Sequence, residues 1–242
     1  MHPTIDLNAD VAESFGRWTL GDDEALMPLL TSANIACGFH AGDAGTIRTQ
    51  VNRAVDLGVR IGAQVSYRDL AGFGRRVMLI EPGDLVDDVL YQVSALDGLA
   101  RLAGDRVRYV KPHGALYHRT LTDTDQAEAV ATAVAAWNRA CGPVAVLTAG
   151  DGELARQARG MGVTVVNEGF ADRAYGIDGR LVPRTEPGAL VLDPHEAGEQ
   201  AVRLAADAAS ICVHGDTPGV VAIATQVRHA LHAAGYRLAA FT

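Results

Sequence analysis

Histidines that could act as general bases or metal ligands recur at the ends of short apolar runs in this 242-residue chain. His113 and His214 are each followed by glycine, and His40 lies two residues after a glycine. An imidazole paired with a carboxylate can activate water, and the same two groups also bind divalent metal ions. The sequence contains no HExxH or HxxxH motif, which would have favoured metal binding. The histidines therefore leave two chemistries open, general acid–base catalysis and metal-assisted hydrolysis.

Carboxylates, amides and arginines follow the same apolar runs. They are Asp6, Asn8, Asp10 and Glu13 at the first run, Asp43 after the second, Gln64, Arg75 and Arg76 at the third, Glu168, Asp172 and Arg173 after the sixth, and Asp216 after the seventh. Single members have ordinary explanations, since Asp43 and Asp216 suit helix N-caps. Because the pattern repeats at six run ends, we interpret the set as one site.

Lys111 is the one lysine among 21 basic residues, and the other 20 are arginines. An ammonium is compact, whereas a guanidinium is a planar fork, so the exception marks a place where the compact cation is needed. Cys37 lies near His40 and resembles a nucleophile, but its apolar surroundings favour a packed thiol. We expect Lys111 to stabilise developing negative charge.

The apolar runs are predicted strands, and segments with 3.6-residue periodicity between them are predicted helices. The strands are predicted at 4–7, 32–37, 60–65, 107–111, 144–148, 163–167 and 210–213, with weaker candidates at 188–192 and 237–241. The helices are predicted at 43–57, 82–102, 123–139, 152–161, 195–206 and 219–234. Their alternation indicates a parallel sheet, and the length favours a single-domain α/β fold over residues 1–242, a TIM-like βα barrel of about seven strands. In such a barrel the carboxyl ends of the strands share one face, which carries the site.

Composition excludes several classes of protein. The formal net charge of −8 argues against general binding to nucleic acid or anionic lipid. The first residues have no basic and apolar leader, and no run approaches the ~20 apolar residues of a membrane span. Three cysteines, Cys37, Cys141 and Cys212, are typical of a reducing compartment, so we expect a cytoplasmic protein. Neither a GxGxxG turn, a P-loop nor a GxSxG elbow is present.

Several long strings resemble the LamB/YcsF family over nearly the whole chain. They are DLNAD with ESFG (6–16), LMPLLTSANIACGFHAGD (26–43), SYRDLAGFGRR (66–76), YQVSAL (91–96), VKPHGALY (110–117), EGFADRAY (168–175) and ICVHGDTPG (211–219). The resemblance implies a seven-stranded barrel akin to polysaccharide deacetylases. It also implies the role of the A subunit of a 5-oxoprolinase, which opens the lactam of 5-oxo-L-proline to L-glutamate with ATP hydrolysis and acts with subunits B and C.

The polar signature of the family, carried over by position, falls on Asp6, Asn8, Asp10, Glu13, His40, Asp43, Lys111, His113, Glu168, Asp172, Arg173, His214 and Asp216. From these we expect catalysis by Asp10, His40, Lys111, His113, His214 and Asp216. We expect substrate binding by Asn8, Glu13, Gln64, Arg75, Arg76, Glu168, Asp172 and Arg173. A divalent metal would fall on Asp10, His40, His113 and His214. His113 or His40, oriented by Asp10 or Asp216, would be the base, and an arginine would pair with the substrate carboxylate.

Two positions depart from the family pattern. Gln64-Val65 stands where the family usually has His-Pro, and Ala12 stands where it usually has glycine. An amide cannot replace an imidazole as a base, although it can hydrogen-bond a substrate. Two other functions therefore stay open, a stand-alone metal-dependent amide hydrolase of deacetylase type and a non-catalytic substrate-binding subunit.

Overall fold

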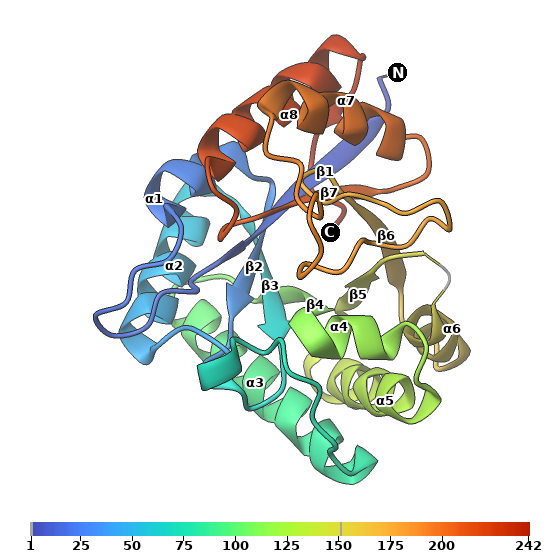
Figure 1. The fold of residues 1–242 in the computed structure, drawn as a ribbon. Helices are drawn as coiled ribbons and strands as arrows, with labels where there is room; N and C mark the ends of the chain where they lie inside the picture. The colour runs from blue at the N-terminus through green and yellow to red at the C-terminus, as the bar shows by residue number, and fades with distance from the viewer. Residues whose placement is uncertain (1, 151) are drawn as a thin grey trace.

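Seven parallel strands form a closed barrel inside a layer of helices in a computed structural model, which describes residues 2–150 and 152–242 (Figure 1). The strands are β1 (Thr4–Val11), β2 (Ser32–Ala36), β3 (Arg60–Val65), β4 (Val107–Pro112), β5 (Ala145–Thr148), β6 (Val165–Phe170) and β7 (Ser210–His214). Each pairs with the next, and β1 closes the barrel by pairing with both β7 and β2. A short strand, β8 (Arg237–Leu238), pairs with the start of β1. The predicted α/β barrel is confirmed.

The helices connect the strands on the outside of the barrel. They are α1 (Asp23–Leu26), α2 (Ala44–Leu57), α3 (Pro82–Leu102), α4 (Gly114–Thr120), α5 (Thr124–Cys141), α6 (Glu153–Gly160), α7 (Pro194–Leu204) and α8 (Val220–Ala233), with 3-10 turns at Met27–Leu29 and Leu70–Gly72. Asp43 caps α2 through its carboxylate, and Gly58 ends that helix in the left-handed conformation. Within the described ranges, no helix combines the length and the hydropathy of a membrane span.

The weaker strand prediction at 188–192 is wrong. This segment lies in the long loop between β6 and α7, and its one residue in an isolated bridge is Leu190, which pairs with Arg173 of the same loop. Gly188 has φ of +79°, and the turn that it closes directs the backbone hydrogen bonds back into the loop. The second weak candidate, 237–241, is a strand only at Arg237–Leu238. Helix α4 has no counterpart among the predicted helices, since its seven residues are too few for a clear period.

Strand β1 places polar side chains inside the barrel because polar and apolar residues alternate along it. Asp6, Asn8 and Asp10 occupy every second position, and all are buried. The intervening Leu7 and Ala9 belong to the apolar core that the helices cover. Successive side chains of a strand point to opposite faces, so the three polar residues share the interior face.

Hydrogen bonds join these interior side chains into a network along the barrel axis. Asp6 accepts from the hydroxyls of Thr31 and Ser32 at 2.6 Å each, and also from Ser210. The amide of Asn34 donates to Asn8 at 2.7 Å and to Asp10 at 2.8 Å. Burial raises the pKa of Asp6 to about 6, although the three hydroxyl donors oppose that rise. The network thus leads from the amino end of β1 towards the mouth of the barrel.

Gly62 on β3 leaves room for the largest interior side chain, Tyr109 of β4. The Tyr109 hydroxyl donates to Asn34 at 2.7 Å, and its ring lies 5.1 Å from the ring of Phe241, near the carboxyl terminus. A Cβ atom on Gly62 would overlap the Tyr109 ring. The glycine is therefore required for packing, because its backbone conformation is an ordinary extended one.

Replacement of Gly62 by alanine should destabilise the protein by about 1–3 kcal/mol, the usual cost of overpacking a core. The control is Gly98→Ala in α3, where an added Cβ meets nothing within 4 Å. Alanine is the better helix former there by roughly 0.5–1 kcal/mol, so this control should be neutral or stabilising. Urea denaturation measures the free energy of unfolding of both variants. An equal and small effect of the two substitutions would contradict the packing role of Gly62.

Candidate active site

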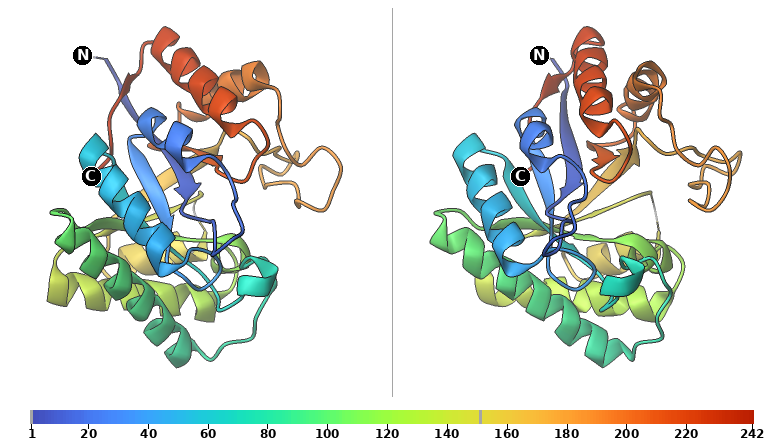
Figure 2. Two further views of the ribbon diagram at one scale, coloured as in Figure 1. Left: turned by 90° about the vertical axis from the view of Figure 1, so that its left-hand side faces the viewer. Right: turned by 60° about the vertical axis from the view of Figure 1, so that its left-hand side comes forward.

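A cavity of about 290 Å³ opens at the carboxyl ends of the strands. Its floor comes from Asp10 of β1, Lys111 of β4, Phe170 of β6 and His214 of β7. Its rim comes from the turn after β3, from α4 and from the loop between β6 and α7, which projects beyond the helices in Figure 2. The volume lies at the small end of the ~300–1,000 Å³ typical of ligand pockets, which suits a small metabolite. Residues from distant parts of the chain thus meet at one mouth.

Lys111 is buried at the floor of this cavity, and all three N–H groups of its ammonium have acceptors. They contact Glu168 Oε2 at 2.7 Å, Asn8 Oδ1 at 3.2 Å and Cys212 Sγ at 3.1 Å. A second carboxylate, that of Asp10, lies 3.7 Å away. The hydrogen-bonding capacity of the ammonium is therefore used by the protein itself.

The protonation of Lys111 depends on the neighbouring acidic groups. Burial alone would lower its pKa, but Cys212, Glu168 and Asp10 outweigh burial and raise the pKa well above 10.5. Burial raises the pKa of the Cys212 thiol well above 9. Cys212 is consequently an uncharged thiol at neutral pH, where the carboxylates of Glu168 and Asp10 supply the negative charge beside Lys111. The charge of Cys212 adds to theirs only at the high pH at which the thiol ionises.

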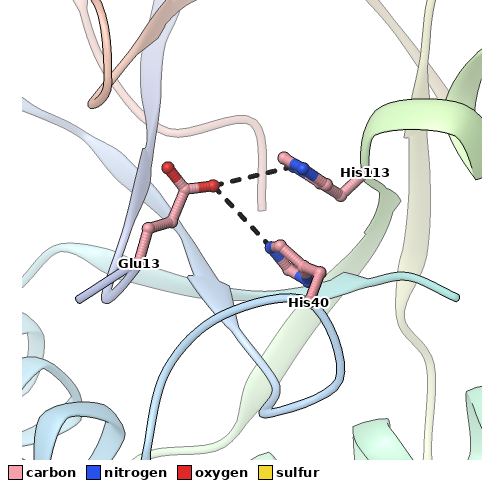
Figure 3. Close-up of side chains that lie close together, drawn as sticks. All are labelled: Glu13, His40 and His113. Atoms are coloured by element: carbon pink, nitrogen blue, oxygen red, sulfur yellow. Dashed lines mark ion pairs between the residues drawn. The ribbon is translucent and has the colours of Figure 1, made fainter. Parts of the chain in front are cut away.

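Glu13, His40 and His113 form a buried triad beside the floor (Figure 3). Glu13 Oε1 lies 3.7 Å from His40 Nε2 and 3.6 Å from His113 Nδ1, and the two imidazoles stack with centroids 4.0 Å apart. One potential ligand atom from each residue lies within 4.8 Å of the others. Neither ring nitrogen of His40 has a hydrogen-bond partner among the described residues. Buried polar atoms are rarely left so, which indicates a missing ligand.

The two histidines of this triad are neutral at physiological pH. Burial lowers the pKa of His40 to about 4. Burial, His40 and Arg75 together hold the pKa of His113 well below 6.5. Burial and the charges of Asp10 and Asp216 raise the pKa of Glu13 well above 4.5. Neutral imidazoles are the form in which histidine binds a cation, whereas Glu13 would have to give up its proton to become a ligand.

Gln64 lies within the triad. Its Nε2 is 3.2 Å from Glu13 Oε1 and 3.0 Å from His113 Nδ1. His113 Nε2 lies 3.0 Å from the carbonyl oxygen of Phe73, so this nitrogen carries the proton and Nδ1 presents its lone pair. The amide of Gln64 thus donates to both ligands, at the position where the sequence departs from the family pattern.

His214 forms a second, separate arrangement with Asp172. Its Nδ1 lies 2.8 Å from Asp172 Oδ1, and Asp172 Oδ2 accepts from the His214 backbone N–H and from Thr217 Oγ1. Burial would raise the pKa of Asp172, but the contacts with His214 and Thr217 lower it to about 2. A carboxylate on Nδ1 leaves the lone pair on Nε2, and His214 lines the cavity. The carboxylate that orients His214 is therefore Asp172. This pair was not predicted from the sequence, which indicated Asp10 or Asp216 as the partner of His113 or His40.

Two arginines flank Asp216 at the rim. Arg75 Nη2 lies 2.5 Å from Asp216 Oδ2, and Arg184 Nη1 lies 3.2 Å from the same oxygen. Both arginines line the cavity, so two cations share one carboxylate there. Arg184 was missed from the sequence because it lies in the loop after β6, far from any strand end. The length of that loop was the available signal, since long loops at this face of a barrel carry functional residues.

Four residues of the predicted set serve other roles. Arg76 is not among the residues that line the cavity, and it pairs with Asp69. Arg173 borders the cavity, but its guanidinium donates to the carbonyls of Val182 and Ala189 and holds the loop. Asp6 lies at the other end of β1, and Asp43 caps α2.

The residues that could hold a metal ion in the structure differ from those predicted from the sequence. Glu13 joins His40 and His113 in the triad, whereas His214 pairs with Asp172 and stacks on Phe170. Asp10 Oδ2 lies 3.9 Å from His113 Nδ1, at the border of the group.

Comparison with known proteins places this barrel among relatives. The chain is 52% identical over 251 residues to the 5-oxoprolinase A subunit of Streptomyces avermitilis, with 98% of this chain and 99% of the relative covered. It superposes on the crystal structure of a lactam utilization protein from Thermus thermophilus with a TM-score of 0.91 and 38% identity, covering 98% of this chain and 100% of that one. A Streptomyces lividans family 4 carbohydrate esterase shares the fold at 12% identity, with a TM-score of 0.53 and 99% and 93% coverage. The LamB/YcsF family sequence model matches residues 5–242, and the chain belongs to the LamB/YcsF family.

Proposed function

We propose that this chain is the A subunit of an ATP-dependent 5-oxoprolinase, which hydrolyses the lactam of 5-oxo-L-proline to L-glutamate. The observation that carries the proposal is the Asp172–His214 pair in a small cavity that also holds a buried ammonium and two rim arginines. The name of the Streptomyces relative at 52% identity supports the substrate, and the word subunit in that name supports partners. We infer that subunits B and C are those partners and that ATP is used by the assembled complex. Three free cysteines support a reducing, cytoplasmic location.

The rim arginines are the proposed carboxylate site. 5-Oxoproline carries one carboxylate, and guanidinium groups bind carboxylates through paired N–H donors. Arg75 and Arg184 are held at the mouth by their shared partner Asp216, which keeps them oriented when the cavity is empty of substrate. Binding there directs the lactam ring towards the floor, where the charge of Lys111 lies.

His214 is the proposed general base. A lactam is a stable amide, and ATP makes it reactive if its carbonyl oxygen is phosphorylated. His214 Nε2 takes a proton from the attacking water and returns it to the ring nitrogen as the C–N bond breaks. The resulting acyl phosphate loses phosphate to a second water. Asp172 stabilises the transient imidazolium, and Lys111 stabilises the negative charge on oxygen through its field.

A divalent metal fits the triad of Glu13, His40 and His113. The fit rests on the two nitrogens of His40, which have no hydrogen-bond partner among the described residues. His113 Nδ1 accepts from Gln64 Nε2 and would exchange that hydrogen bond for the ion. When bound, such an ion would polarise a carbonyl or phosphoryl oxygen. Gln64 would then hydrogen-bond the Glu13 carboxylate from the side.

His214→Gln and Asp172→Asn should each lower kcat for glutamate formation by about 10²–10⁴-fold, because both remove the oriented base. KM for 5-oxoproline should change little, since neither residue contacts the rim arginines. The matched control is His229→Gln on the exposed side of α8, which should keep full activity. The assay is ATP-dependent glutamate release by the chain with subunits B and C. Near-normal kcat in His214→Gln would refute the assignment of the base.

Metal binding gives an independent test of the triad. Chelator-treated protein should take up about one equivalent of Zn²⁺ or Mn²⁺ in calorimetry, and His40→Gln should abolish it, because the site loses one of three ligands. His195→Gln removes an exposed imidazole and should bind as the wild type does. Equal metal uptake by His40→Gln and wild type would exclude the triad as the site. Metal-dependent lactam hydrolysis without the partners would instead support the stand-alone hydrolase.

A further inference from the structure

A second cavity, of about 750 Å³, lies beside the first, on the side of the barrel. It is bordered by the carboxyl ends of β5 and β6, by α4, by the end of α7 and by the loop after β6. Tyr117, His118, Phe170 and Leu181 line both cavities. The two spaces are thus separated by a single layer of side chains.

The short strand β5 is the reason that the wall is open here. Pairing between β5 and β6 ends at Thr148 and Asn167, whereas β6 continues to Phe170 and pairs on its other side with β7. The covering helices diverge at the same place. Helix α6 packs on α5 and α7 packs on α8, on either side of β6 (Figure 1). The carboxyl-terminal half of β6, from Glu168 to Phe170, consequently lines the second cavity.

The layer of side chains between the two cavities contains a buried ion pair and two further polar atoms. Lys111 lines the first cavity and Glu168 the second, and their ion pair of 2.7 Å spans the partition. The other carboxylate oxygen, Glu168 Oε1, and the Tyr117 hydroxyl are buried, and neither has a partner at full hydrogen-bond geometry among the described residues. The two side chains interact with each other, and Glu168 contributes, after burial, to raising the pKa of Tyr117 well above 10. Tyr117 and Phe170 meet edge to face, with ring centroids 5.6 Å apart. The outer rim carries the exposed Arg180 and Arg203.

These features suit a zwitterionic amino acid better than an anionic lactam that has no ammonium group. An α-amino acid has an ammonium group for a carboxylate oxygen and carboxylates for arginines. Of the proposed substrate and product, only the product has the ammonium, because the ring nitrogen becomes an amine when the C–N bond breaks. Glu168 would hold the charged ammonium more strongly than the amide N–H of the lactam.

We infer that the second cavity is the exit through which the amino-acid product leaves the barrel, past Glu168 and the Tyr117–Phe170 pair. This inference rests on the proposed function. It allows the mouth to be covered by a partner protein while the product departs through the side.

The test fills the second cavity without touching the first. Ala208 and Ala149 are half-buried and line only the second cavity, so Ala208→Trp and Ala149→Leu narrow it from two walls. Ala103→Trp, at a half-buried alanine that ends α3, is the matched control. Each variant is assembled with subunits B and C and is used only if its melting temperature stays near that of the wild type.

Rapid-quench assays compare one turnover, with enzyme in excess over 5-oxoproline, with steady-state turnover. We expect both fillers to keep the single-turnover rate and to lower the steady-state rate about tenfold, so that a burst of glutamate appears. The control should change neither rate. Unchanged rates in both fillers, or an equal fall of both rates, would overturn the exit while leaving the proposed function intact. Absence of turnover in the wild-type complex would overturn the proposed function and the exit together.

Discussion

The buried charge of Lys111 is the constraint on which the rest of the site depends. An ammonium inside a barrel has a large desolvation cost unless charges and hydrogen bonds offset it. Here Glu168, Asp10 and Asn8 supply that compensation. Glu168 lies on β6, and Asn8 and Asp10 lie on β1. Two of the polar residues at alternate positions of β1, Asn8 and Asp10, thus compensate the lysine, and Asn34 donates to both of them. The fold and the site are one network.

That network divides the chemistry between neighbouring groups. The two neutral imidazoles of the Glu13, His40 and His113 triad suit a cation, whereas the Asp172–His214 pair suits proton transfer. The rim arginines add positive charge at the mouth of a chain whose net charge is −8. The two arginines share the single carboxylate of Asp216, so the mouth has a local excess of positive charge although the protein as a whole is acidic.

The sequence predicted the elements whose signals are local. The cap at Asp43, the left-handed Gly58 and the polar ends of the strands could be read from composition and period, and the barrel followed from the alternation of elements. Contacts between residues on different strands of the barrel could not be predicted from the sequence. Asp172 orients His214 because β6 and β7 are neighbours, and Glu13 reaches the two histidines because the chain turns at Ala12, which has φ of +62°. Arg184 depends on the course of a long loop, and no periodicity records that course.

Because Lys111 is the one lysine of the chain, its charge can be measured directly. Protein labelled with ¹⁵N-lysine should give one side-chain ammonium signal, whose chemical shift reports the protonation of Nζ as pH is raised. Since the carboxylates of Glu168 and Asp10 hold its pKa well above 10.5, the signal should stay that of the ammonium up to the pH at which the protein unfolds. Deprotonation of the folded protein below about pH 9, a pKa shift in the opposite direction, would mean that burial outweighs the carboxylates. It would contradict the charged centre from which this account of the site is built.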